Sequence, residues 1–370
     1  MKILLAPDKF KGSLSAEEVC EALGKGLKKV QPDVELIIRP LADGGDGSLD
    51  ILGHYFELET HVCEVQDPLG RSISASYNMA QGVAYIEMSK ASGLVLLKAE
   101  ERTAMKTSSF GTGQLIRDAL DKGAKEVYLF IGGSATNDGG TGIAQALGYR
   151  FLDAEGNEVE AIGEKLIDID RIDGSQVLEE LREISVKVIC DVNNPFYGPH
   201  GAAYVYAAQK GASPEEIAFL DKGLEHLAEK LVSQGYVDVN TVPGAGAAGG
   251  VGGGSIAFLN AELIAGIEMF LQISELEKWV KASDLIITGE GKMDAQTEHG
   301  KVVSGVSQLA QKYRKPVIGV CGVADEGVAE KLKLNKVHTI MSRSQSIEEA
   351  MSKAAQKLEE IGELILSNSQ

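Results

Sequence analysis

Six segments of the chain place glycines, carboxylates, lysines or hydroxyls at or just after the end of an apolar run. They are APDKFKGSLS (6–15), PLADGGDGS (40–48), FIGGSATNDGG (130–140), ICDVNNP (189–195), PGAGAAGGVGGG (243–254) and ITGEGKMDAQT (287–297). In open α/β folds, ligands bind beyond the carboxyl ends of the strands, where loops converge and the following helices present free N–H groups. The six segments therefore predict one large, polar cleft that tolerates an anion.

The segment GGSATNDGG contains the densest set of hydrogen-bond donors. Its glycines let backbone N–H groups approach an anion, and its hydroxyl and amide side chains add donors before a helix expected to begin near Thr141. The alternative is a tight turn in which Asp138 caps that helix. Four polar residues in one turn favour phosphate binding. The residues predicted to bind nucleotide phosphate here are Gly132, Gly133, Ser134, Thr136, Asn137, Asp138 and Gly139.

A second glycine-rich run contains Gly244-x-Gly246-x-x-Gly249, which formally matches a dinucleotide-binding fingerprint. That fingerprint needs a strand directly before it and a helix opening at its third glycine. Here Pro243 precedes the motif and glycines continue to Gly254. We therefore expect a flexible loop or hinge in which Gly246 and Gly249 contribute to nucleotide or phosphate binding, and give NAD little weight.

Lysines and carboxylates supply the charged groups of the predicted site. Lys9 and Lys11 follow the first apolar run and suit a phosphate or carboxylate, although a solvated turn with Ser13 or Ser15 as a helix cap is the alternative. Five carboxylates follow apolar runs, and together they suit Mg²⁺, which prefers one or two carboxylates plus phosphate oxygens and water. They are Asp43, Asp46, Asp191, Glu290 and Asp294.

Sequence context suggests different roles for these groups. Asp191 ends an apolar run before two asparagines and a proline, so we expect a partly buried carboxylate that can act as a general base. Glu290 and Asp294 flank Lys292 in a looser turn, which favours metal binding by the two acids and charge neutralisation by the lysine. The predicted catalytic residues are Asp191, Lys292 and Lys9, and the predicted metal ligands are Glu290 and Asp294.

Composition and charge exclude several other classes of protein. The net charge of −18 and the pI near 4.9 disfavour nucleic acid and anionic membranes as partners. The four cysteines are far apart, as expected for reduced thiols, and the short N-terminal apolar run does not resemble a signal segment, so we expect a cytoplasmic location. No Walker motif and no Ser-His-Asp arrangement is evident. The oligomeric state is left open.

The order of apolar and amphipathic stretches predicts the architecture that positions these groups. Both chain ends alternate buried runs with helical periods, as βαβ units of one doubly wound, Rossmann-like parallel-sheet domain do. Residues 58–88 instead read as antiparallel strands. We predict an α/β protein with one domain from residues 1–68 plus 283–370, an inserted α/β domain of mixed sheet from residues 69–282, and an active site in the cleft between them.

Seven motifs, in order along nearly the whole chain, resemble those of the type 1 glycerate kinases. They are DKFKGSLSA, PLADGGDGS, SFGTGQLI, GGSATNDGG, CDVNNP, PGAGAAGG and TGEGKMDAQT. The resemblance implies ATP-dependent phosphorylation of D-glycerate with Mg²⁺ as a cofactor. Members of the family make 2-phosphoglycerate or 3-phosphoglycerate; we favour the 2-phospho product, and the sequence leaves the choice open. The resemblance also implies substrate-binding residues, which we assign to Lys11, Ser13, Arg71, Asp43 and Asn193. A nicotinamide-dependent dehydrogenase of a small hydroxy acid and a non-catalytic organic-acid-binding protein are the alternatives.

Overall fold

The computed structural model describes residues 1–45, 47–295, 297 and 301–367. The chain divides into two compact units, one from Met1–Tyr55 with Ala265–Gln370 and one from Phe56–Ile264. We call them the terminal unit and the central unit. The first boundary, between Tyr55 and Phe56, lies before the strand β3 (Glu59–Gln66). This strand pairs with β4 (Ser72–Ala80) and therefore belongs to the central unit. Among the described residues, no helix has the length and apolar character needed to cross a membrane.

The terminal unit contains a five-stranded sheet, and all its strand pairs are parallel. Its strand order is β13-β12-β11-β1-β2, with β1 at Lys2–Leu5, β2 at Glu35–Ile38, β11 at Leu285–Met293, β12 at Val317–Ala324 and β13 at Lys336–Thr339. On one side of β1 lies β2, the next strand in the sequence. On the other side lie β11, β12 and β13, in that order outward from β1. The direction of the strand order therefore reverses between β1 and β11.

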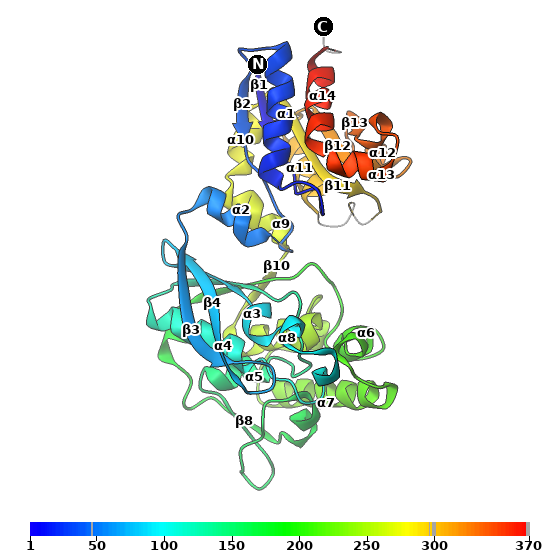
Figure 1. The fold of residues 1–370 in the computed structure, drawn as a ribbon. Coiled ribbons are helices and arrows are strands. Elements are labelled where there is room, and N and C mark those ends of the chain that lie inside the picture. Colours follow the sequence, from blue (N-terminus) through cyan, green and yellow to red (C-terminus); the bar gives the residue numbers. More distant parts are fainter. Residues whose placement is uncertain (46, 296, 298–300, 368–370) are drawn as a thin grey trace. The chain divides into compact units, whose positions relative to one another are not determined.

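The α-helices of the terminal unit lie between and after its strands. They are α1 (Ala16–Val30), α2 (Ser48–Tyr55), α9 (Gly266–Ile273), α10 (Leu276–Ala282), α11 (Val302–Lys312), α12 (Val328–Lys331), α13 (Ile347–Ser352) and α14 (Ala354–Ser367). Ser15 forms a capping box with Glu18 at the start of α1. Figure 1 shows α1 beside α14, and Gly26 allows this approach because a Cβ there would lie 1.9 Å from the Glu359 carbonyl oxygen.

The central unit contains a six-stranded mixed sheet in the order β10-β9-β6-β5-β4-β3. β3, β4 and β5 (Val83–Glu87) pair antiparallel, as the sequence predicts for this part of the chain. The pairs from β5 through β6 (Glu126–Phe130) and β9 (Ser185–Ile189) to β10 (Glu262–Ile264) are parallel. A separate antiparallel pair joins β7 (Arg150–Leu152) to β8 (Arg171–Asp173). The predicted α/β class, with a parallel sheet from both chain ends and a mixed sheet between, is confirmed.

Six α-helices of the central unit lie between or after these strands. They are α3 (Ser89–Ser92), α4 (Phe110–Asp121), α5 (Thr141–Ala146), α6 (Ala202–Tyr206), α7 (Pro214–Ser233) and α8 (Ala247–Leu259). The expectation of a flexible loop at the second glycine-rich run is wrong, because most of that run lies buried in α8. Residues 248–250 interrupt α8 with left-handed backbone angles.

Candidate functional site

A pocket of about 410 Å³ lies at the carboxyl ends of β1 and β11 in the terminal unit. Three of the segments singled out from the sequence meet there, because the pocket is lined by the loop after β1, by Asp43, and by the end of β11. The predicted residues in its lining are Lys9, Lys11, Ser13, Asp43, Glu290, Lys292 and Asp294. The pocket lies where the strand order reverses, the usual ligand position in open α/β sheets.

Two buried carboxylates, those of Asp8 and Glu290, line this pocket. Asp8 is 8% exposed, and its carboxylate accepts a hydrogen bond of 2.6 Å from the Lys9 backbone N–H. Burial, and then the nearby charge of Asp43, raise the pKa of Asp8 to about 7. Asp8 is absent from our sequence-based site, although it occupies the same position after an apolar strand as the acids that we did select.

Glu290 carries an unusual buried oxygen. The residue is 7% exposed, and burial raises the pKa of its carboxyl group. Its Oε1 atom has no hydrogen-bond partner among the described residues, while Oε2 lies 3.9 Å from the Lys301 Nζ. A buried carboxylate oxygen without a partner is costly, so this atom indicates a ligand or cation that binds in the pocket.

The pocket also contains several cations. Lys9 is half-buried and Lys11 is exposed, whereas the Nζ of Lys292 forms a 3.0 Å ion pair with Asp294. The Ser13 hydroxyl donates a 2.9 Å hydrogen bond to the Met351 carbonyl oxygen, so it connects the loop after β1 to α13. The terminal unit therefore combines lysines and carboxylates around one cavity, as phosphoryl-transfer sites do.

Asp8→Asn is expected to stabilise the free protein at high pH. The folded-state pKa of about 7 lies above the ordinary value of 3.8, so Asp8 favours folding below pH 4 and this contribution is lost as the pH rises through 7. The variant should therefore gain stability over the wild type at pH 8, by on the order of a few kcal/mol, and little at pH 4. Calorimetric melting at both pH values checks this, with exposed Asp33→Asn as the control. An equal shift at both pH values would contradict the assignment.

The glycine-rich loop after β6 is largely buried in the central unit. Only Gly132 and Gly133 of residues 132–140 are exposed. The buried Asp138 carboxylate accepts hydrogen bonds from the Ser109 N–H and hydroxyl, both at 2.7 Å, and from the N–H groups of Gly140 and Gly142 at 3.1 and 3.3 Å. Asp138 thus holds the beginnings of α4 and α5 together, which agrees with the capping alternative. The surface that this loop offers to an anion is the Gly132–Gly133 turn.

A buried lysine that the sequence analysis missed supports the same loop. Lys210 is 1% exposed, and its Nζ donates to the Ser134 hydroxyl at 2.9 Å and to the Thr136 carbonyl oxygen at 2.7 Å. Burial lowers the pKa of Lys210 to about 7. The side-chain polar atoms of Thr136 and Asn137 are buried without a hydrogen-bond partner among the described residues. No sequence signal marks Lys210, because it follows an alanine-rich helical stretch far from the loop.

The second glycine-rich run packs against the first. A Cβ at Gly249 would lie 2.0 Å from the Thr136 carbonyl oxygen, and one at Gly246 would lie 2.1 Å from the Pro195 carbonyl oxygen. The Gly139 N–H donates a 3.0 Å hydrogen bond to the Gly249 carbonyl oxygen. A 3₁₀ turn at Val239–Thr241 precedes this run where the dinucleotide fingerprint requires a strand. These glycines therefore allow close backbone packing.

The remaining predicted residues lie in the central unit. Asp191 and Asn193 follow β9 and are exposed, so the expected partial burial of Asp191 is wrong. The Arg71 guanidinium forms ion pairs with Asp67 at 2.5 Å and with Glu101 at 2.7 Å. Asp46 lies outside the described residues. Within the described ranges, no group of three or more histidine, cysteine, aspartate or glutamate side chains is arranged so that it could hold a metal ion.

Comparison with known proteins identifies the family. Residues 3–369 match the glycerate kinase family. A glycerate 2-kinase of Escherichia coli (strain K12) is 43% identical over 354 residues, which cover 95% of this chain and 93% of that protein. A glycerate kinase of Halalkalibacterium halodurans is 41% identical over 362 residues, which cover 97% of this chain and 95% of that protein.

A solved structure agrees with these relatives. A crystal structure from Salmonella typhimurium LT2, described as a candidate glycerate kinase 2, matches with a TM-score of 0.88 at 40% identity. The match covers 100% of this chain and 98% of that one. The chain therefore belongs to the glycerate kinase family, and the protein is a phosphotransferase.

Proposed function

We propose that this protein transfers the γ-phosphoryl group of ATP to the 2-hydroxyl of D-glycerate and releases 2-phosphoglycerate and ADP. The observation that carries the proposal is the pocket of the terminal unit, which is lined by lysines and by Glu290, whose carboxylate has one buried oxygen without a hydrogen-bond partner among the described residues. Phosphoryl transfer depends mainly on positioning and charge neutralisation, and this lining supplies groups for both. The name of the Escherichia coli relative, glycerate 2-kinase, supports the choice of hydroxyl.

Glu290 and Asp294 are the proposed ligands of Mg²⁺. Both line the pocket, and the buried Glu290 oxygen without a hydrogen-bond partner fits a carboxylate that accepts a cation. Mg²⁺ commonly takes one or two carboxylates and completes its shell with phosphate oxygens and water, so these two acids are sufficient. When bound, the ion would neutralise negative charge on the phosphate oxygens.

The other predicted residues take complementary roles in the proposal. Asp191 accepts the proton of the attacking hydroxyl, whose oxygen forms a bond to the γ-phosphorus while the bond to the β,γ-bridging oxygen breaks. Lys9 and Lys292 neutralise charge on the transferred group. The residues proposed to bind glycerate are Lys11, Ser13, Asp43, Arg71 and Asn193. For Arg71 this role requires release of one of its two ion pairs.

Release of ADP tests the activity directly. Purified protein with MgATP should release ADP when D-glycerate is added, and much less with L-glycerate or without an acceptor. Oxidation of NADH through pyruvate kinase and lactate dehydrogenase reports the ADP. The absence of acceptor-dependent ADP would refute the kinase activity and favour a non-catalytic acid-binding protein.

Gly132→Val tests the proposed role of the glycine-rich loop. The N–H groups of the exposed Gly132–Gly133 turn are proposed to bind an ATP phosphate, so a side chain there should obstruct it. Loss of a charge-assisted hydrogen bond of about 1.5–3 kcal/mol predicts a rise in the KM for ATP of about 10- to 100-fold. Gly132 is a better site than Gly133, because a Cβ at Gly132 would meet no atom within 4 Å whereas Gly133 has a φ of +71°.

The matched control for this variant is Gly53→Val. Gly53 is also exposed, and a Cβ there would also meet no atom within 4 Å. The control should leave both KM values near those of the wild type, and both variants should melt within a few degrees of it. An unchanged KM for ATP in Gly132→Val would contradict the proposed phosphate binding and would show that the Gly132–Gly133 turn is purely structural.

A further inference from the structure

We propose that the adenine ring of the nucleotide binds in the pocket of the terminal unit, against an apolar wall formed by Val323, Ile340, Met341, Ile347 and Met351. This inference deepens the proposed function and rests on it. It places the base of the nucleotide in the terminal unit. The role proposed above for the glycine-rich loop after β6 is limited to binding an ATP phosphate.

The wall exposes apolar side chains that ordinary packing would cover. Ile347 is 67% exposed, Met351 is 46% exposed and Val323 is 43% exposed, and all three line the same pocket as the lysines and carboxylates. Ile340 and Ala350 lie buried in the same lining. Covering apolar surface of this kind with a flat ring is favourable by about 25 cal/mol per Å². Single exposed apolar residues are normal, but several around one cavity indicate a ligand.

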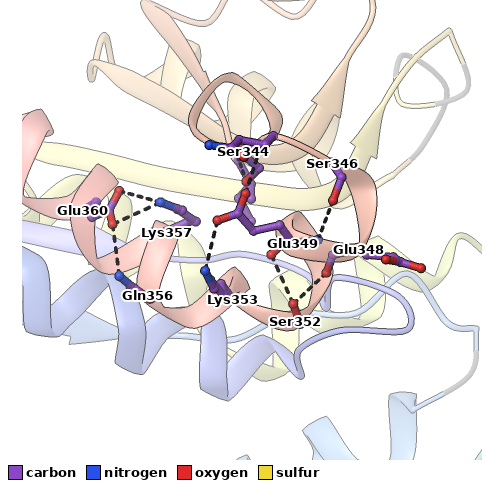
Figure 2. A network of polar contacts seen from close by, with 11 residues as sticks. Ser344, Ser346, Glu348, Glu349, Ser352, Lys353, Gln356, Lys357 and Glu360 are labelled. Atoms are coloured by element: carbon purple, nitrogen blue, oxygen red, sulfur yellow. Dashed lines mark hydrogen bonds and ion pairs between the residues drawn. The ribbon is translucent and has the colours of Figure 1, made fainter.

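Hydrogen bonds hold this wall in place. Figure 2 shows α13 and the start of α14, where the Ser346 hydroxyl accepts from the Glu349 N–H at 3.1 Å and the Lys353 Nζ contacts Glu349 at 3.1 Å. The Ser13 hydroxyl attaches the Met351 carbonyl oxygen to the loop after β1. Ile347 and Met351 are one helical turn apart on α13, so they present a preformed surface.

The lining of the same pocket also supplies the charges that a nucleotide phosphate chain requires. Lys9, Lys11, Lys292 and Lys301 line it together with the proposed metal ligands. A cavity of about 410 Å³ is in the range of about 300–1,000 Å³ that drug-sized ligands occupy. A three-carbon acid has no apolar surface to place against the wall, whereas a nucleotide has an apolar ring at one end and anions at the other. The reversal of strand order between β1 and β11 is also where nucleotides bind in such sheets.

Photolabelling of the wild-type protein tests the location of the base without relying on activity. The probe is 8-azido-ADP with Mg²⁺, followed by irradiation, trypsin and mass spectrometry. Trypsin cuts after Arg343 and Lys353, so the peptide of residues 344–353 contains both Ile347 and Met351. We expect label on this peptide and protection by excess ADP. Label confined to peptides of the central unit would overturn the inference.

Ile347→Asp tests the same contact by kinetics. The inhibition constant of ADP and the KM for ATP should rise about tenfold or more, since about 1.5–3 kcal/mol is gained when a large aliphatic group is buried. The KM for glycerate and inhibition by tripolyphosphate, which has no base, should stay within twofold. The control is Val62→Asp on β3, because Val62 is 63% exposed and outside the pocket.

The outcomes separate this inference from the proposed function. Failure of the wild-type protein to bind or turn over ATP would contradict the proposed function itself. Normal turnover combined with unchanged nucleotide constants in Ile347→Asp would overturn only the base site. If Ile347→Asp raised only the KM for glycerate, the apolar wall would bind the acceptor, and the proposed base site would also be overturned.

Discussion

Asp191→Asn is expected to reduce kcat by about 100- to 10,000-fold, the usual range for the loss of a general base. The substitution keeps the size of the side chain but removes the carboxylate that is proposed to accept the hydroxyl proton. The KM for ATP and the dependence on Mg²⁺ should change little. Steady-state kinetics at several Mg²⁺ concentrations provide the measurement.

The control for Asp191→Asn is Asp153→Asn. Asp153 also follows a strand in the central unit, and its carboxylate accepts a 2.8 Å hydrogen bond from the Asn157 N–H. The control should keep wild-type kcat. If excess Mg²⁺ restores Asp191→Asn, the roles of base and metal ligand are reversed. If kcat is unchanged, Asp191 has no part in the chemistry, and the buried Asp8 becomes the candidate base.

Glu290→Gln is expected to raise the Mg²⁺ concentration needed for half-maximal activity by at least about 10- to 100-fold, because even the loss of an outer-shell partner of a metal ligand has an effect of this size. The amide keeps the shape of the side chain but removes the charge at the buried oxygen. Excess Mg²⁺ should restore part of kcat. Direct titration with Mn²⁺, followed by the electron paramagnetic resonance of the free ion, should show the same weakening.

Asp294→Asn is the companion variant to Glu290→Gln. It should shift the Mg²⁺ requirement in the same direction, but it also removes the ion-pair partner of Lys292 at 3.0 Å. A fall in kcat that excess Mg²⁺ cannot restore is therefore expected for Asp294→Asn in addition. Wild-type metal dependence in both variants would show that neither acid binds the ion.

The sheet architecture could be predicted because it depends on local patterns. Alternating apolar runs and helical periods at both chain ends correspond to one parallel sheet, and the alternation over residues 58–88 corresponds to β3, β4 and β5. The break between α13 and α14 at Lys353 could not be predicted, because the apolar periodicity of residues 347–366 continues across it. Periodicity records which face is buried and does not mark such a break.

The site was predictable where a residue follows its own strand, and less so where distant segments meet. Lys9 lines the pocket from the loop after β1, and Glu290 and Lys292 line it from the carboxyl-terminal part of β11, where a looser turn was expected from the sequence. Lys210 was missed because its role comes from folding against Ser134 and Thr136, which are 76 and 74 residues away. Gly249 resembles a phosphate-binding glycine in sequence, yet its closest neighbour is the Thr136 backbone. Composition alone cannot distinguish a glycine that allows a ligand to bind closely from one that allows another segment of the backbone to pack closely.

Identification of the product tests the central claim most directly. Protein, MgATP and D-glycerate are incubated with enolase, and phosphoenolpyruvate is followed by its ultraviolet absorbance, with and without phosphoglycerate mutase. Transfer to the 2-hydroxyl predicts a signal with enolase alone that mutase does not increase. A signal that appears only with mutase would contradict the proposed hydroxyl, and the absence of signal under both conditions would contradict the kinase activity itself.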